Sequence, residues 1–141
     1  MAIHSFKSRV YWSDTDAARI AHFSSIFRFC EMAEESLFNE KLGWKWNPRA
    51  GVMMPRVRAE CDFHRPLHVH DEFRVDIVDI LIGEKSITYR LEVVNETRGY
   101  KAATCSLVTV AVDPETIKPI PVPIDLRRRL IEVGARERGQ A

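Results

Sequence analysis

The sequence predicts an α+β fold in which an antiparallel sheet of about five strands wraps around one long central helix. The first observation is a single segment, residues 24–42, whose apolar residues recur at helical spacing around most of its circumference. The second is a set of segments before and after it in which apolar and polar residues alternate, as in strands. A long apolar helix followed by a strand meander buries its surface only when the sheet encloses it.

The first elements are a strand, a turn and the helix. Residues 3–12 are rich in β-forming side chains and lead into a turn of Ser, Asp and Thr residues. The helix is expected from about Ser24 to Leu42, because Ser24 or Ser25 is a suitable N-cap and Gly43 is a suitable end. The apolar stripe that should face the sheet contains Ile26, Cys30, Ala33 and Leu37.

Four strands are expected after the helix. In residues 53–63 the face predicted to be buried contains Val57, Ala59, Cys61 and Phe63. In residues 72–82 the apolar positions shift by one, which indicates a β-bulge. Two further alternating segments, about 87–93 and 100–112, complete an antiparallel meander.

The composition indicates one compact domain, residues 1–141, that needs no metal or disulfide to fold. It ends in a short helix at about 125–134, capped by Asp125, and a polar tail. The net charge is only +1, from 21 basic and 20 acidic residues, so neither a nucleic acid nor a membrane is an expected partner. The basic run Arg127–Arg129 is typical of a solvated helix face.

The cysteines and the N-terminus predict a cytoplasmic protein. Cys30, Cys61 and Cys105 are far apart in the sequence and lie among apolar or alternating residues, as small buried hydrophobic side chains do. Residues 1–6 lack the apolar run of a secretory leader, and no segment is long and apolar enough to span a bilayer. A reducing compartment fits these features best.

Several segments together resemble a known family. They are YWSDTDAA (residues 11–18), HFSS (22–25) and FRFCE (27–31), followed by MPRV (54–57), CDFHRPL (61–67), DEFRV (71–75) and KS (85–86). This pattern, over about residues 5–130, resembles the hotdog-fold acyl-CoA thioesterases of the 4-hydroxybenzoyl-CoA thioesterase type. The resemblance implies a hotdog fold and the hydrolysis of an acyl-CoA thioester to a free acid and CoA.

Thioester hydrolysis needs an attacking group and hydrogen-bond donors where negative charge develops on the carbonyl oxygen. Asp16 lies just before the expected helix start, where backbone N–H groups have no internal partner. The resemblance implies that Asp16 is the nucleophile or general base and that the Phe23 backbone N–H, with that of Ser24, polarises the carbonyl. His22 is a weaker catalytic candidate because it is close in sequence to Asp16, whereas Asp14 is more typical of a turn cap.

The sequence departs from the family at the same loop. Relatives have glycine where Arg19 stands, so Arg19 either adopts a conformation that glycine prefers or reshapes the loop. Many relatives also have an aromatic residue where His22 stands. They have His or Tyr in place of Phe23, and Tyr in place of Ile26. The Phe23 position therefore keeps only its backbone N–H as a functional group.

Other groups are weaker site candidates. Glu31, Glu34 and Glu35 lie on the helix, and some hotdog thioesterases use a helix carboxylate in catalysis. Pairing with Arg28 is the more ordinary role for such glutamates. Glu31 is the best catalytic candidate of the three. Lys85 is the candidate for binding the CoA phosphates, with Arg65 weaker. A metal site is considered for Cys61, His64, His68, His70 and Asp71, but an exposed hairpin is favoured because paired cysteines are lacking.

The expected partners are an acyl-CoA substrate and further copies of the chain, as a homodimer or homotetramer with sites between subunits, because one thin sheet leaves apolar surface uncovered. No cofactor is expected, since CoA is part of the substrate. Two alternatives stay open: a non-catalytic acyl-CoA or acyl-carrier binding module, and a hydratase that uses Asp16 and His22. The acyl group is not specified, although Trp44, Trp46, Met53 and Met54 are possible pocket residues.

Overall fold

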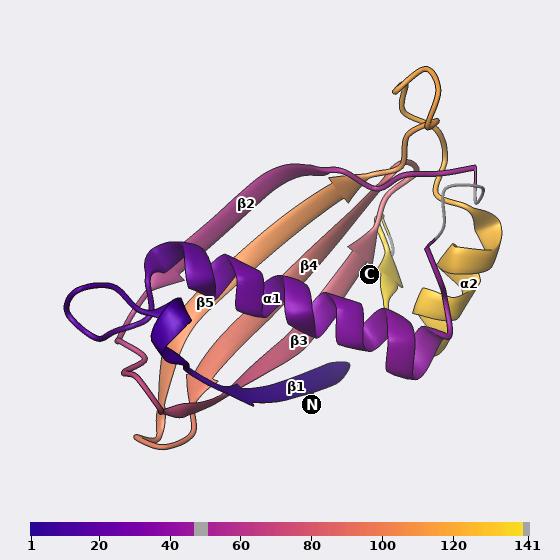
Figure 1. Ribbon diagram of the computed structural model, residues 1–141. Helices are drawn as coiled ribbons and strands as arrows, with labels where there is room; N and C mark the ends of the chain where they lie inside the picture. The colour runs from indigo at the N-terminus through magenta and orange to yellow at the C-terminus, as the bar shows by residue number, and fades with distance from the viewer. Residues whose placement is uncertain (47–50, 140–141) are drawn as a thin grey trace.

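The computed structural model describes residues 1–46 and 51–139 and has one sheet that curves around one long helix (Figure 1). Its elements are β1 (His4–Arg9), a 3₁₀ turn (Trp12–Asp14), α1 (Phe23–Leu37) with a π-helical turn (Phe38–Leu42), β2 (Arg56–Phe63), β3 (Glu72–Ile82), β4 (Ser86–Asn95), β5 (Tyr100–Val110), α2 (Ile124–Glu132) and β6 (Arg136–Glu137). The strand order is β1-β3-β4-β5-β2, with β6 parallel to β3 and every other pairing antiparallel. The predicted fold class is confirmed.

The core lies between α1 and the concave face of the sheet. The rings of Phe29 on α1 and Phe73 on β3 stack with centroids 4.2 Å apart. Cys30, Ala33 and Leu37 follow at helical spacing and are fully buried. The predicted apolar stripe of the helix is therefore the face that packs on the sheet.

The start of α1 differs from the prediction, whereas its end agrees. His22 is the N-cap, and its Nδ1 accepts a hydrogen bond from the Ser24 N–H at 3.2 Å. Ser25 instead donates its hydroxyl to the Asp14 carbonyl oxygen at 2.8 Å, so neither serine is the cap. Gly43 ends the π-helical turn with φ +61°, the left-handed conformation that glycine adopts without strain.

The strand β2 forms one edge of the sheet, and the burial of its side chains differs from the prediction. A register shift between Arg56 and Arg58 is a β-bulge that directs Arg56 toward α1 and leaves Val57 60% exposed. Phe63 is on the helix side but remains 52% exposed. The face predicted to be buried is thus largely open in a single chain. The bulge predicted in β3 is present between Ile77 and Asp79.

The three cysteines meet in space. Cys61 on β2 and Cys105 on β5 are directly opposite in the strand register and form a disulfide, with their Cα atoms 4.1 Å apart. The sulfur of Cys30, on α1, lies within 4.8 Å of both sulfur atoms. The prediction of three separate thiols is wrong, because antiparallel pairing aligns two residues 44 positions apart. The cysteines therefore give no support to a reducing compartment.

The helix α2 closes one end of the sheet, with Leu126 and Leu130 fully buried. Arg129 donates to the Leu42 carbonyl oxygen at 2.8 Å, and Arg127 donates to that of Gly83 at 2.7 Å. The prediction of a simply solvated basic run is therefore wrong for these two residues. Asp125 lies in the first turn of α2 and pairs with Arg128 and Arg129, while Pro123 occupies the N-cap.

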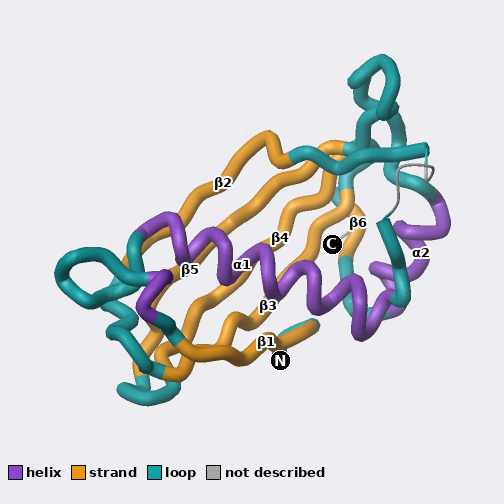
Figure 2. Tube along the Cα trace, in the orientation of Figure 1, coloured by secondary structure: helices purple, strands orange, loops and turns teal. Residues whose placement is uncertain are grey.

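The loops gather at the two ends of the sheet (Figure 2). One end holds the loop from residue 10 to 22 and the segment from 64 to 71, which contact each other through backbone hydrogen bonds. The opposite end holds the segments that follow α1 and β5, with α2. The loop predicted around Trp44–Gly51 falls partly on residues 47–50, outside the described residues. No helix in the described part of the chain is both long and apolar enough to cross a bilayer.

Candidate active site

Asp14 ties the loop before α1 to the start of the helix. Its buried carboxylate accepts from the Tyr11 N–H at 2.8 Å and pairs with the Arg28 guanidinium. Its carbonyl oxygen accepts from the His22 N–H and from the Ser25 hydroxyl, both at 2.8 Å. The carboxylate and the carbonyl oxygen of Asp14 are therefore both hydrogen-bonded, and the residue has the structural role of a turn cap.

Asp16 lies in a short hairpin held by the bridge between Thr15 and Ala21. Its backbone N–H donates to the Ile20 carbonyl oxygen at 2.9 Å, and the Arg19 N–H donates to the Asp16 carbonyl oxygen at 3.0 Å. The Asp16 side chain is exposed, and its Oδ1 accepts from the Ala18 N–H at 2.8 Å. One carboxylate oxygen is thereby fixed in place while the group stays open to solvent.

Arg19 has φ +64°, the left-handed conformation that glycine adopts most easily. Arg19 therefore adopts the conformation that glycine prefers, at the cost of backbone strain, and the loop is not reshaped. The Arg19 carbonyl oxygen accepts from the Val69 N–H at 2.9 Å, and the Ala21 N–H donates to the Leu67 carbonyl oxygen at 2.7 Å. These bonds to the segment 64–71 hold the Asp16 loop in its shape.

The N-terminus of α1 presents one free donor. Phe23 is the first helical residue, and its N–H has no hydrogen-bond acceptor within residues 1–46 and 51–139. The Ser24 N–H is already bonded to Nδ1 of His22, so the second donor implied by the resemblance is occupied. The helix dipole adds a partial positive charge at this end, which favours an anionic oxygen beside Phe23.

His22 has a structural role that limits its chemistry. Its Nδ1 lies 2.8 Å from the Ser24 hydroxyl as well as accepting from the Ser24 N–H, and its ring packs on Phe23 with centroids 4.5 Å apart. Only Nε2 is left for proton transfer. The Phe23 ring itself is 60% exposed beside the helix start.

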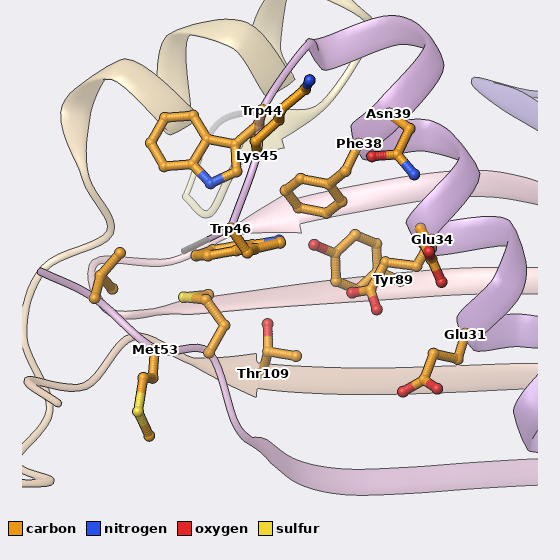
Figure 3. Close-up of a pocket in the computed structure, with 13 residues that line it drawn as sticks. Glu31, Glu34, Phe38, Asn39, Trp44, Lys45, Trp46, Met53, Tyr89 and Thr109 are labelled. Atoms are coloured by element: carbon orange, nitrogen blue, oxygen red, sulfur yellow. The ribbon is translucent and has the colours of Figure 1, made fainter. Parts of the chain in front are cut away.

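The main cavity lies at the other end of α1, between its second half and strands β4 and β5 (Figure 3). It has a volume of about 920 Å³. Its lining consists of Glu31, Glu34, Glu35, Phe38, Asn39, Trp44, Lys45, Trp46, Val52, Met53, Met54, Tyr89 and Thr109. Of the four predicted catalytic residues, only Glu31 lines the cavity. Within one chain, the first half of α1 therefore lies between the Asp16 loop and the cavity.

Arg56 pairs with two of the three helix carboxylates that line the cavity, Glu31 and Glu34. It forms a two-contact hydrogen-bonded ion pair with Glu34 and a longer pair with Glu31 at 3.6 Å. Burial alone would lower the pKa of Arg56, but the hydrogen bond and charge of Glu34 outweigh it and raise the pKa. The predicted pairing of these glutamates is present, but the partner is Arg56, because Arg28 is bound to Asp14.

The histidine-rich segment 64–71 joins β2 to β3, which are not neighbours in the sheet, so the prediction of a hairpin is wrong. Its side chains do not gather around one point. Nε2 of His64 lies 2.9 Å from the Thr104 hydroxyl, while Nδ1 of His68 lies 3.5 Å from the Asp71 carboxylate. Asp71 is buried and accepts hydrogen bonds from Asn95 at 2.8 Å and from Arg98 at 2.9 Å. In the described part of the chain, the cysteine cluster is the one set of His, Cys, Asp or Glu side chains spaced closely enough to hold a metal ion.

The two residues predicted to bind CoA phosphates lie at opposite ends of the sheet. Lys85 is exposed in the turn between β3 and β4, at the end where α2 lies. Arg65 is exposed near the Asp16 loop, and its guanidinium stacks over the Tyr100 ring at 3.9 Å. A single chain therefore does not bring them to one mouth.

A family model described as the thioesterase-like superfamily matches residues 10–130. The chain belongs to this superfamily. A 1,4-dihydroxy-2-naphthoyl-CoA hydrolase of Rippkaea orientalis is 30% identical over 130 residues, which cover 85% of the chain and 89% of the relative. A hydrolase of the same name from Synechococcus elongatus is 25% identical over 128 residues, with 87% and 91% covered.

Solved structures of the superfamily share the fold. A 1,4-dihydroxy-2-naphthoyl-CoA thioesterase from Synechocystis superposes with a TM-score of 0.85 at 20% identity, covering 92% of this chain and 96% of that one. A thioesterase superfamily protein from Jannaschia gives a TM-score of 0.80 at 27% identity, with 91% and 90% covered. The predictions of a hotdog fold and of a thioester hydrolase are confirmed.

Part of the cavity was predicted from the sequence. The possible pocket residues all line it, namely Trp44, Trp46, Met53 and Met54. Neither Tyr89, which lines the cavity (Figure 3), nor Arg56, which holds Glu34 from β2, was predicted in this role. Simple alternation gives no sign of the bulge that turns Arg56 toward α1.

Proposed function

We propose that the protein hydrolyses an aromatic acyl-CoA thioester, with Asp16 as nucleophile or general base, as in the 4-hydroxybenzoyl-CoA thioesterase type. The observation that carries this proposal is the free Phe23 N–H at the start of α1, in the same fastened loop as the exposed Asp16 carboxylate. The names of the relatives support a 1,4-dihydroxy-2-naphthoyl group or a similar acyl group. The aromatic lining of the cavity supports it too.

Two routes are open to Asp16. As a general base, it takes a proton from water, and the oxygen of that water bonds to the carbonyl carbon. As a nucleophile, it bonds to that carbon itself, and water then hydrolyses the resulting anhydride. In both routes the Phe23 N–H donates to the carbonyl oxygen as it becomes negative, and the carbon–sulfur bond breaks to release CoA as its thiolate.

The site is proposed to lie between two chains, in a homodimer or in a homotetramer built from two such dimers. β2 is an edge strand with exposed Val57 and Phe63, and two copies can pair there about a twofold axis. Such pairing is antiparallel, so Arg56 at the cavity end of one β2 comes near Phe63 of the other. Phe63 packs against Phe27 near the start of α1, with ring centroids 6.4 Å apart. The Asp16 loop of one chain then approaches the cavity of its partner.

The remaining predicted residues keep subordinate roles in this proposal. Ser24 and Arg65 lie at the Asp16 end of the chain, where the thioester and CoA would pass. Lys85 is exposed at the cavity end and remains the candidate for the CoA phosphates. CoA enters only as part of the substrate, and no cofactor or metal is required by either route.

The direct test is the release of CoA from a panel of acyl-CoA thioesters, followed with a thiol reagent. Asp16→Asn should lower turnover at least about a hundredfold, the usual scale for losing an acid–base or nucleophilic group. Asp113→Asn is the matched control, because Asp113 also accepts a backbone N–H in an exposed loop, that of Glu115 at 2.8 Å. Its turnover should equal that of the wild type.

Other outcomes point to other functions. If Asp16→Asn retains full activity while Glu31→Gln loses it, the helix carboxylate performs the chemistry and the assignment of Asp16 is wrong. If the wild type binds acyl-CoA but releases no CoA from any member of the panel, the protein is a binding module.

A further inference from the structure

The cavity beside α1 has an aromatic wall suited to a flat ligand. The Trp46 ring lies near the rings of Phe38 and Trp44, with centroids 5.6 Å and 5.7 Å away. Met53 and Met54 extend this wall, and their flexible thioethers adapt to the shape of a ring system. The volume of about 920 Å³ is large enough for a bicyclic aromatic group.

An unpaired donor lies in this wall. Nε1 of Trp44 is shielded from solvent and has no hydrogen-bond partner within the described residues. An indole N–H can only donate, and a buried donor without an acceptor is unfavourable. A ligand oxygen inside the cavity is therefore a suitable partner for Trp44.

A hydroxyl group lies at the floor of the same cavity (Figure 3). Tyr89 is only 1% exposed, and it lies close to Glu34, which Arg56 holds in an ion pair. Burial, reinforced by the charge of Glu34, raises the pKa of Tyr89 well above its ordinary value. The phenol therefore keeps its proton. The Tyr89 oxygen still has lone pairs that can accept a hydrogen bond.

We propose that Trp44 and Tyr89 are specificity-determining residues that select an acyl ring carrying a hydroxyl group. The ring hydroxyl donates to the Tyr89 oxygen, and the Trp44 N–H donates to an oxygen of the same ring system. An unsubstituted ring gives the Trp44 N–H no acceptor and the Tyr89 oxygen no donor, so it binds less well. This proposal rests on the proposed thioester hydrolysis, and it adds the side chains that distinguish a hydroxylated aromatic acyl group from a plain one.

The kinetic test compares 1-hydroxy-2-naphthoyl-CoA with 2-naphthoyl-CoA, which differ by one hydroxyl. The wild type should prefer the hydroxylated substrate by roughly tenfold or more in kcat/KM. Tyr89→Phe and Trp44→Phe each keep an aromatic ring and remove one polar group, and each should reduce this preference by slowing the hydroxylated substrate more than the plain one. Equal losses on both substrates, or an unchanged preference in both variants, would overturn the proposal. The two variants are independent, so one that fails to fold leaves the other as the test.

A binding measurement separates this proposal from the proposed hydrolysis. Calorimetric titration of the protein with 1-hydroxy-2-naphthoate and with 2-naphthoate reports on the cavity without any reaction. Tighter binding of the hydroxylated acid, lost in Tyr89→Phe, supports the selection by these residues even if no acyl-CoA is hydrolysed. Hydrolysis without discrimination in either measurement means that this proposal alone is wrong.

Discussion

Substitutions of Arg19 test whether this residue has a positive φ in the loop that carries Asp16. With φ +64°, Arg19 occupies a conformation that costs a non-glycine residue about 1–2 kcal/mol. Replacing it with glycine removes this strain but adds backbone freedom to the unfolded chain, which offsets about 0.5–1 kcal/mol. Arg19→Gly should therefore increase the free energy of unfolding by about 0.5–1 kcal/mol, and raise Tm by roughly 2–3 °C for a chain of this size.

Arg19→Ala is the matched control, because it removes the guanidinium but keeps the Cβ atom that causes the strain. Thermal unfolding of both variants should place glycine above alanine by about 1 kcal/mol. Turnover should change less than about twofold in Arg19→Gly, since the loop already has the shape that glycine would adopt. A variant with glycine less stable than alanine would show that residue 19 does not have a positive φ, and the placement of Asp16 would need revision.

Two further variants test other parts of the structure. Asp14→Ala should lower the free energy of unfolding in urea by about 2–3 kcal/mol, because it leaves the Tyr11 N–H and Arg28 without their acceptor. It should also lower turnover by misaligning the start of the helix. An unfolding free energy equal to that of the wild type would contradict this. For Asp71, burial alone would raise the pKa, but hydrogen bonds from Asn95, the His68 N–H and Arg98 outweigh it and lower the pKa below 3.8. Its stabilisation is therefore present above that value and is lost as the pH falls through the lower folded-state pKa. Unfolding of Asp71→Asn should depend less on pH below about pH 4 than that of the wild type, and an identical dependence would be inconsistent with this role.

The sequence carried enough information for the fold because its periodicities are strong. The stripe that includes Cys30 and Leu37 and the slip in β3 correspond to contacts in the structure. The N-cap was missed because capping depends on which side chain has the right backbone geometry, and His22 occupies that position while Ser25 is drawn to Asp14. Sequence patterns do not specify such competition between neighbouring hydrogen-bonding groups.

The cavity was predicted only in part: Trp44, Trp46, Met53 and Met54 were named as possible pocket residues, but the groups that face them come from distant parts of the chain. Arg56 of β2 reaches Glu34 of α1 only through a bulge, and Tyr89 of β4 lies close to the same carboxylate. The pairing of Cys61 with Cys105 likewise follows from the register of β2 and β5. The Asp16 loop was predicted from a local motif, which explains why its position was foreseen while its distance from the cavity in one chain was not.

In the proposed dimer, Asp16 of one chain acts on a thioester whose acyl group lies in the cavity of the partner. Mixing two inactive variants tests whether the site is shared in this way: Asp16→Asn, which keeps the cavity, and Met54→Trp, which fills it. When chains of the two variants are refolded together in equal amounts, half of the dimers are mixed and one of the two sites in each is intact. If the site is shared between two chains, the mixture should recover roughly a quarter of wild-type CoA release. A mixture no more active than the two variants measured separately would contradict it.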